Sequence, residues 1–382
     1  MKVFSEIVGQ ERPISILESA IKAASQGSNS QEMTHAWLFT GPPGSGRSNL
    51  AIAFAAALVC KNGGCNECRE CETAKNGTHP DVEIVKVEGV SIKIDEVRDL
   101  VARSAWGAST SPWRIVIIED CDRMTEAASN ALLKAIEEPG VQTIWLLCAP
   151  TLHDVLPTIR SRCRNINLTT PSTSAVANFL EKNMKASKEL ASLAAKISQG
   201  HIGKARLFFQ SEDSRSAREK IFTILFSAKD HSSAIKSAES LLDLAKERTD
   251  TRLANFNERE EADLRAAYQG TSRGLISGGA KVLKDLEKEQ KARITRTIKD
   301  ELDSYLLDYA TFLRDCLGPI EEIINEDMAE EISKIRAKNS PELITELALA
   351  VNRTREVLLT NAAQLLALEA LFLEIAPMNR GN

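Results

Sequence analysis

Several features are missing from this sequence of 382 residues, and each absence excludes a class of protein. No stretch approaches the run of about eighteen apolar residues that a membrane-spanning helix needs. The amino terminus, MKVFSEIVGQERP, lacks the apolar core of a secretory signal. We therefore expect a cytoplasmic protein that does not contact a membrane.

An excess of positive charge is also missing. The formal net charge is −5 at pH 7, so nothing in the overall charge attracts nucleic acid. Any contact with DNA would have to be local or made through partners. The apolar content of 43% and the charged content of 26% are typical of soluble globular proteins, and the length predicts two or three domains.

Four of the eight cysteines are close together in the sequence, and we predict that they bind a metal. Cys60, Cys65, Cys68 and Cys71 have the spacing C-x4-C-x2-C-x2-C, which in a reducing cytosol indicates metal binding rather than disulfides. Four thiolates favour zinc in a closed, structural site. A redox Cys-x2-Cys pair is the alternative, but it would need only two of the four. We interpret His79 as an ordinary loop residue.

The first 170 residues alternate between strand-like and helix-like patterns. Near-continuous apolar runs, which predict strands buried on both faces, occupy residues 36–40, 81–87, 114–120 and 143–150. Helical patterns lie between them, at residues 48–59, 94–104 and 125–137. The alternation predicts a three-layer α/β domain with a parallel sheet.

Strand patterns disappear after the polar break at residues 168–174. We predict a domain over residues 1–170, a small helical domain over 171–213, and an all-helical domain over 214–382. Residues 281–299 are rich in lysine and arginine. We interpret them as a solvated helix face, with contact to a nucleic-acid backbone as the alternative.

A glycine-rich loop follows the predicted strand at residues 36–40 and precedes a predicted helix. Backbone N–H groups of such a loop can cradle phosphates at a helix amino terminus. The loop departs from the pattern G-x-x-x-x-G-K-[ST] at one position, where arginine replaces lysine. Its key residues are Gly41, Gly44, Gly46, Arg47 and Ser48. Arginine is longer and planar, so the change is not conservative at a site that needs a point charge.

Two acids, Glu119 and Asp120, end the predicted strand at residues 114–120. A magnesium-binding strand next to a phosphate loop would end in Asp-Glu, so the order here is reversed. We interpret the pair as the remnant of a metal site. The alternative is that both acids simply cap the end of a strand.

Four segments together resemble the AAA+ subunits of bacterial sliding-clamp loaders, and in particular the delta-prime type of the DNA polymerase III holoenzyme. They are VGQERPISIL (8–17), the loop at 41–48, IIEDCDRMTEAASNALLKAIEEP (117–139) and LPTIRSRC (156–163). The resemblance implies a RecA-like AAA+ domain, a helical lid and a helical collar. It also implies a hetero-pentamer with gamma/tau-type and delta-type subunits, which loads the sliding clamp on primed DNA.

The resemblance also implies a role for Arg162. In the family, the arginine of Ser-Arg-Cys reaches across a subunit boundary to the γ-phosphate that the neighbouring subunit holds. A planar, permanently charged guanidinium suits that role. Without the resemblance, a surface arginine paired with a carboxylate would be the ordinary interpretation.

The family's ATP-hydrolysing subunits carry two sensor residues that this chain lacks. The threonine after the fourth strand is replaced by Ala149 or Pro150, and the arginine of the lid by Gly203, with Lys204 and Arg206 nearby. Together with the altered loop and the reversed acids, these departures predict that the site does not hydrolyse ATP. Binding without hydrolysis stays open.

Two other functions are consistent with parts of the sequence. The chain could be an ATP-hydrolysing gamma/tau-type subunit that tolerates Arg47. It could instead be a zinc-dependent nucleic-acid-binding protein that uses residues 60–71 and the basic segment 281–299.

Overall fold

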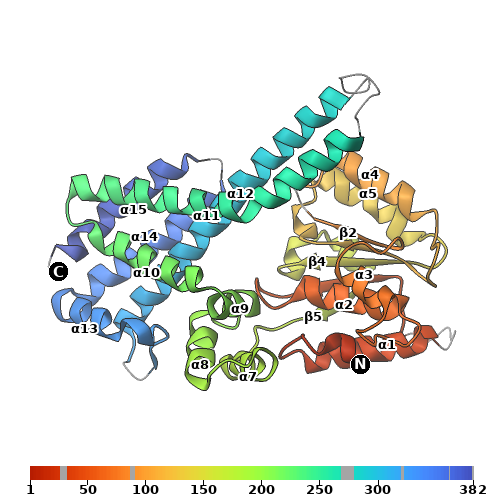
Figure 1. Cartoon of the computed structure of the whole chain (residues 1–382), viewed down its shortest axis with the longest axis horizontal. Helices are drawn as coiled ribbons and strands as arrows, with labels where there is room; N and C mark the ends of the chain where they lie inside the picture. The colour runs from red at the N-terminus through yellow and green to blue at the C-terminus, as the bar shows by residue number, and fades with distance from the viewer. Residues whose placement is uncertain (26–31, 87–90, 268–278, 320–321, 361, 381–382) are drawn as a thin grey trace. The chain divides into compact units, whose positions relative to one another are not determined.

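The computed structural model describes residues 1–25, 32–86, 91–267, 279–319, 322–360 and 362–380. The chain divides into two compact units, residues 1–209 and residues 210–382, which we call the amino-terminal and carboxyl-terminal units (Figure 1). The finer division at residues 170 and 213 stays a prediction.

The amino-terminal unit is built on a parallel sheet of five strands, in the order β2-β3-β4-β1-β5. The strands are β1 (Ala36–Thr40), β2 (Val82–Val85), β3 (Arg114–Ile118), β4 (Thr143–Ala149) and β5 (Arg164–Asn167). The predicted parallel sheet is confirmed. β5 escaped prediction because its sequence, RNIN, buries only Ile166.

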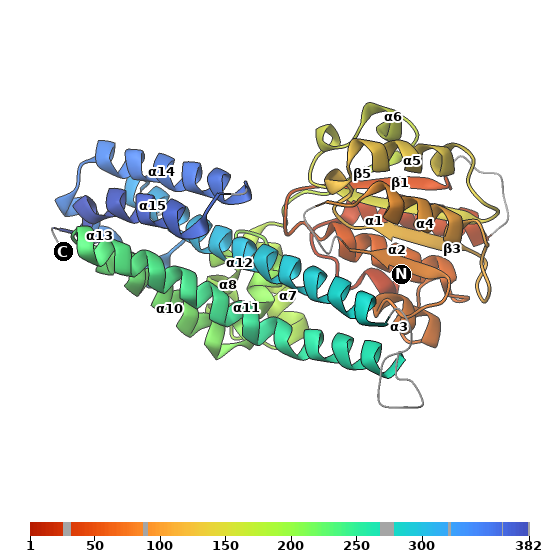
Figure 2. The ribbon, with the colours of Figure 1, turned by 90° about the horizontal axis from the view of Figure 1, so that it is seen from above.

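Helices cover both faces of this sheet, so the predicted three layers are confirmed (Figures 1 and 2). α1 (Glu11–Ser25) and α2 (Arg47–Val59) pack on one face, and α4 (Ile94–Ser104) and α5 (Glu126–Glu137) on the other. Alternate residues of β1 enter the two cores: Trp37 and Phe39 face α2, and Leu38 faces the opposite layer. Both faces are therefore apolar, as the continuous strand pattern predicted.

Short elements connect these layers, and three helices form a separate core at the end of the unit. The short elements are η1 (Lys2–Phe4), α3 (Arg69–Lys75), η2 (Cys121–Arg123), η3 (Leu152–Asp154) and α6 (Pro157–Arg160). The three helices, which we call the lid, are α7 (Thr173–Met184), α8 (Lys188–Ile197) and α9 (Ile202–Gln210). Their shared core includes Val176, Leu180 and Ala194, together with Val8 from the amino terminus.

Within its described residues, the carboxyl-terminal unit contains helices and no strands. Its helices are α10 (Glu212–Ser227), α11 (His231–Ala267), α12 (Gly279–Leu317), η5 (Glu326–Met328), α13 (Ala329–Lys338), α14 (Pro341–Leu359) and α15 (Gln364–Asn379). The core cluster takes in α11 up to Ala245 and α12 from Ile298 onward. Among the helices of the described residues, none is both long and apolar enough to cross a membrane.

Beyond this core, α11 and α12 run side by side as a long antiparallel pair (Figure 2). Arg293 of α12 binds Glu260 of α11 with an N–O distance of 2.8 Å, and Arg252 binds Glu301 at 3.3 Å. The basic segment 281–299 lies on α12. Its exposed lysines are Lys281, Lys284, Lys288 and Lys291. These contacts agree with a solvated face that carries ion pairs, while contact with nucleic acid stays untested.

Asp81 fixes the loop that leads into β3. Its carboxylate is buried and accepts hydrogen bonds from the backbone N–H and hydroxyl of Ser109 and of Thr110, and from the N–H of Ser111, at 2.6–2.8 Å. Burial alone would raise the pKa of Asp81, but the hydrogen bonds from Ser109 and Thr110 outweigh it and hold the pKa well below the ordinary value. The folded protein therefore contains Asp81 as a charged carboxylate.

We expect Asp81→Asn to lower the free energy of unfolding by about 2 kcal/mol at pH 7, because an amide turns an N–H group toward these donors. The lowered pKa means that the contribution is complete above about pH 3.9 and declines as the pH falls toward the folded value. Urea unfolding at pH 7 and pH 3 should therefore show a smaller difference at pH 3. The control is Asp95→Asn, at a carboxylate that is 86% exposed. An equal loss of stability in both variants would contradict this account.

Candidate functional site

The phosphate loop, residues 41–48, joins the carboxyl end of β1 to the amino end of α2. Gly44 and Gly46 have φ angles of +83° and +90°, which side chains rarely tolerate. A Cβ at Gly44 would also overlap the ring of His201, at the amino end of the lid helix α9. The loop therefore has the glycine conformation that the sequence predicted, and it lies directly against the lid.

The side chain of Gln10 links this loop to Thr169, just after β5. This side chain is buried and donates to the carbonyl of Thr169 at 2.7 Å and to the carbonyl of Ser45 at 3.4 Å. It also accepts a hydrogen bond from the N–H of Thr169 at 3.3 Å. The sequence alone indicates no role for Gln10, although this residue lies within the segment VGQERPISIL; only the fold brings it to the loop.

The side chain of Arg47 turns into the loop and is only 12% exposed. Its guanidinium donates to the carbonyl of Gly41 and lies 3.6 Å from the carboxylate of Asp120. The other acid, Glu119, lies 3.8 Å from the ammonium of Lys86. The structure thus brings Arg47 and Asp120 together. The guanidinium of Arg47, which stands where the pattern has lysine, therefore contacts groups of its own site.

A cleft of about 400 Å³ opens between the loop, the amino-terminal segment and the lid. Ligand pockets of this size are common. Among its lining residues are Val3, Glu6, Ser48, Gly203 and Arg206. Ser48 of the loop and Gly203 of the lid thus line the same cleft.

On the lid side of this cleft, Arg206 forms an ion pair and a cation–π contact with other residues of the chain. The guanidinium of Arg206 lies 3.0 Å from the carboxylate of Glu6 and 5.0 Å from the ring centroid of Phe179. Burial, and then the charge of Lys204, lower the pKa of His201, which favours its neutral form.

The first sensor position lies beside the loop. Ala149 is the last residue of β4 and is fully buried, and the carbonyl of Pro150 accepts the N–H of Gly41 at 3.0 Å. Neither side chain can donate a hydrogen bond to a phosphate. The contact between Pro150 and the loop is made by the backbone.

Arg162 lies elsewhere on the same unit, in the turn after α6. Its side chain is 40% exposed, and its guanidinium lies 2.6 Å from the carboxylate of Glu137 at the end of α5. It also donates to the carbonyl of Thr158 at 2.8 Å and to the hydroxyl of Ser161 at 3.1 Å. Exposed ion pairs of this kind contribute about 0.2–1 kcal/mol, so another anion can compete for the guanidinium at little cost.

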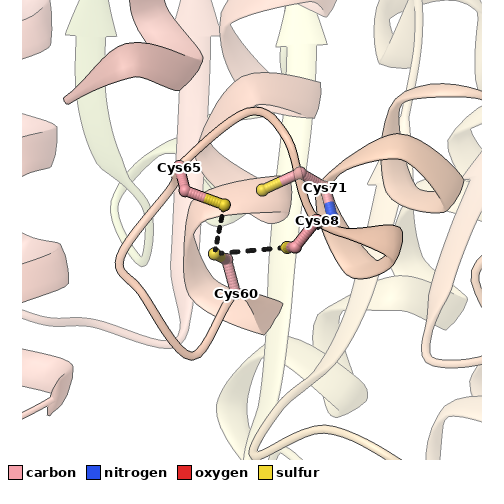
Figure 3. A group of neighbouring side chains, drawn as sticks. All are labelled: Cys60, Cys65, Cys68 and Cys71. Atoms are coloured by element: carbon pink, nitrogen blue, oxygen red, sulfur yellow. Dashed lines mark hydrogen bonds between the residues drawn. The ribbon is translucent and has the colours of Figure 1, made fainter.

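The four clustered cysteines converge, as Figure 3 shows. Their sulfur atoms all lie within 4.8 Å of one another, and that of Cys60 lies 3.7 Å from that of Cys65 and 3.6 Å from that of Cys68. In tetrahedral zinc with Zn–S bonds of about 2.3 Å, sulfurs are about 3.8 Å apart. The donor set and its spacing therefore fit one zinc ion.

Helix ends and backbone N–H groups shape the cluster. Cys60 directly follows the last residue of α2, and Cys68 caps the amino end of α3 and accepts the N–H of Cys71 at 3.5 Å. A hydrogen bond from the backbone of Glu67 is the main cause that lowers the pKa of Cys65 to about 6. The backbone therefore favours the thiolate form of Cys65, the form that binds metal, whereas burial raises the pKa of the Cys71 thiol.

His79 does not belong to the cluster. Its side chain is fully buried, its Nε2 lies 2.7 Å from the carboxylate of Glu70, and its Nδ1 accepts the N–H of Asp81 at 3.0 Å. Both ring nitrogens therefore have partners within the protein, which agrees with its interpretation as a loop residue.

The five-stranded parallel sheet, the glycine-rich loop after β1 and the helical lid define an AAA+ type of fold. Residues 16–172 match the family described as DNA polymerase III, delta subunit. The resemblance of the chain to delta-prime clamp-loader subunits is confirmed over this part of the sequence.

Curated relatives of two kinds match this chain. The delta-prime subunit of Pseudomonas aeruginosa is 37% identical over 154 residues, which are 39% of this chain and 47% of that protein. The delta-prime subunit of Bacillus subtilis is 30% identical over 205 residues, 52% of this chain and 62% of that protein. The tau subunit of Bacillus subtilis is 30% identical over 184 residues, 47% of this chain and 31% of that protein. The chain thus spans less than two thirds of the length of each of these relatives.

Proposed function

We propose that this chain is a subunit of the DNA polymerase III clamp loader that does not hydrolyse ATP itself and supplies Arg162 to the site of a neighbouring subunit. One contrast supports this proposal. Arg47 is 12% exposed and bound within its own loop, whereas Arg162 is 40% exposed on the surface. Of these two guanidinium groups, the more exposed one lies outside the chain's own cleft, which supports a role for it at another subunit's site.

Arg162 would act as an arginine finger. The turn after α6 holds the guanidinium by bonds to Thr158 and Ser161, so few side-chain rotamers remain to be ordered on assembly. In a head-to-tail ring, one subunit's surface faces the next one's site. The guanidinium would exchange Glu137 for the γ-phosphate and stabilise the charge that develops there during hydrolysis.

The proposed partners are gamma/tau-type and delta-type subunits in a hetero-pentamer, and through that assembly the sliding clamp and primed DNA. The carboxyl-terminal unit, with its large helical core, is proposed as the collar. The test is to mix the purified chain with these subunits, to ask whether it enters the assembly, and to compare ATP turnover with and without the Arg162 side chain.

Zinc is the proposed cofactor, held by Cys60, Cys65, Cys68 and Cys71. When bound, it would supply a closed tetrahedral cross-link with no position open for substrate. The cysteines would join the end of α2 to the start of α3, so the metal's role would be structural.

An ATP-hydrolysing subunit of the same machine is the second candidate. The match to the tau subunit of Bacillus subtilis favours it. Ala149 and Gly203 oppose it, because neither residue has a side chain that can form a hydrogen bond with a γ-phosphate.

We expect the isolated chain to show no ATP turnover above a protein-free blank, and Arg47→Lys to remain inactive. Lysine would restore one charge, but the two sensor side chains would still be missing. The measurement is phosphate release together with calorimetric titration of ATP, which detects binding separately. Measurable turnover by the unaltered chain would favour the tau-type candidate.

A further inference from the structure

Helix α2 connects the two sites of the amino-terminal unit. It begins at Arg47 in the phosphate loop and ends at Val59, directly before the zinc ligand Cys60. Nine of its 13 residues are buried, and they form part of the core on one face of the sheet. The two sites therefore lie at opposite ends of one packed helix of 13 residues.

The cysteine loop also holds the amino terminus. The N–H of Val3 donates to the carbonyl of Gly64 at 3.1 Å, and the ammonium of Lys2 lies 2.6 Å from the carboxylate of Glu67. Gly64 has a φ angle of +88°, and a Cβ there would lie 2.8 Å from Cγ1 of Val3. Close backbone contact between the loop and the first residues thus depends on glycine at this position.

The same amino-terminal segment forms a wall of the cleft. Val3, Glu6, Ile7 and Val8 line it. Val3 is 2% exposed, so it is held on both sides, by the cysteine loop and by the core. Glu6 then reaches the lid through its ion pair with Arg206, at 3.0 Å. A continuous series of contacts runs from the cysteines to the lid.

We propose that the metal site acts as a clasp for the cleft beside the loop at residues 41–48. With zinc bound, the cysteine loop holds residues 1–8 in position as one wall of this cleft. Through Glu6, the same segment keeps the lid in place. The inference rests on the zinc site proposed above. It assigns the metal a second effect, at a distance from its own ligands, on the opening of the cleft and the lid.

Hydrogen exchange on the isolated full chain tests the clasp, before and after zinc is removed with a chelator. Zinc content is measured on the same samples. We expect exchange at residues 3–8 and 199–206 to rise about tenfold when the metal is removed, because their local opening becomes easier. Residues 126–137 of α5, on the other face of the sheet, should not change. Increased exchange confined to residues 60–71, or a chain purified without zinc, would overturn the proposal.

Two glycine variants separate the clasp from the metal. Gly64→Ala places a Cβ against Val3, whereas at Gly63, which also has a positive φ angle of +60°, a Cβ meets only Met1, at 4.0 Å. Both changes strain the backbone, but only the first disturbs the contact with Val3. We expect both variants to retain zinc, and Gly64→Ala alone to raise exchange at residues 3–8. Equal exchange at these residues in both variants would contradict the clasp.

A third variant avoids any change in backbone strain. Glu67→Gln removes the ion pair with Lys2 and leaves all four cysteines in place. Both side chains are largely exposed, so we expect a smaller rise in exchange, about twofold, at the amino-terminal residues.

None of these measurements involves a partner subunit. A failed Arg162 experiment would therefore leave the clasp standing, and a failed exchange experiment would leave the arginine finger standing.

Discussion

Replacing Arg162 by alanine should lower ATP turnover at the neighbouring subunit's site by about a thousandfold, with folding and assembly unchanged. The loss is large because the guanidinium stabilises charge that develops mainly in the transition state. Folding should be unaffected because the ion pair with Glu137 is exposed on both sides. The measurement is steady-state phosphate release by the reconstituted assembly, with subunit content checked by size-exclusion chromatography and light scattering.

Arg160→Ala is the matched control, since it removes the same charge two residues earlier on α6. Arg160 is half-buried and its guanidinium donates to the carbonyl of Leu152 at 3.5 Å, a contact within its own chain. Arg162→Lys is the second control, because it keeps the charge and loses the planar fork. The proposal fails if Arg162→Ala turns over ATP at the unaltered rate, or if Arg160→Ala is equally impaired.

Replacing Cys65 by serine should abolish stoichiometric zinc binding. Cys65 is the best choice of the four because it is half-buried, so its loss changes core packing less than that of Cys60 or Cys71, which are buried. If free zinc stands a thousandfold above its dissociation constant, removal of the site costs the folded state about 4 kcal/mol. The melting temperature of the amino-terminal unit should fall by about 10 °C.

Zinc content is measured by atomic emission on protein purified without added chelator, and unfolding by scanning calorimetry. Cys163→Ser is the control, since Cys163 is also a half-buried free thiol but lies outside the cluster. It should retain one zinc per chain. If Cys65→Ser keeps its zinc and its melting temperature, the four cysteines are not the ligands that hold the metal.

Much of the sheet was predictable because its strands are buried on both faces. The apolar runs at residues 36–40 and 143–150 coincide closely with β1 and β4, since every residue in these strands is buried. β5 was not predictable in this way. It lies at the edge of the sheet and pairs with β1 through its backbone, while its polar side chains stay outside the apolar core.

The site was predictable in its residue types but not in its contacts. The glycine loop, the two acids and the cysteine spacing are local in sequence, so their positions follow from pattern. The pairing of Arg47 with Asp120 and that of Arg162 with Glu137 depend on side-chain directions across 73 and 25 residues of chain (120 − 47 and 162 − 137). The hold of Gln10 on Thr169 spans 159 residues. Contacts of that kind appear only when the chain is folded.

The long pair formed by α11 and α12 has a mechanical consequence. The core cluster of the carboxyl-terminal unit ends at Ala245 on α11, so residues 246–267 extend about 30 Å beyond it at 1.5 Å per residue. Cross-helix ion pairs such as Arg293–Glu260 stiffen this arm without anchoring its far end to that core. A tilt of about 10° at the base carries the far end through about 5 Å. Small rotations within the helical core are thus amplified into displacements the size of a side chain.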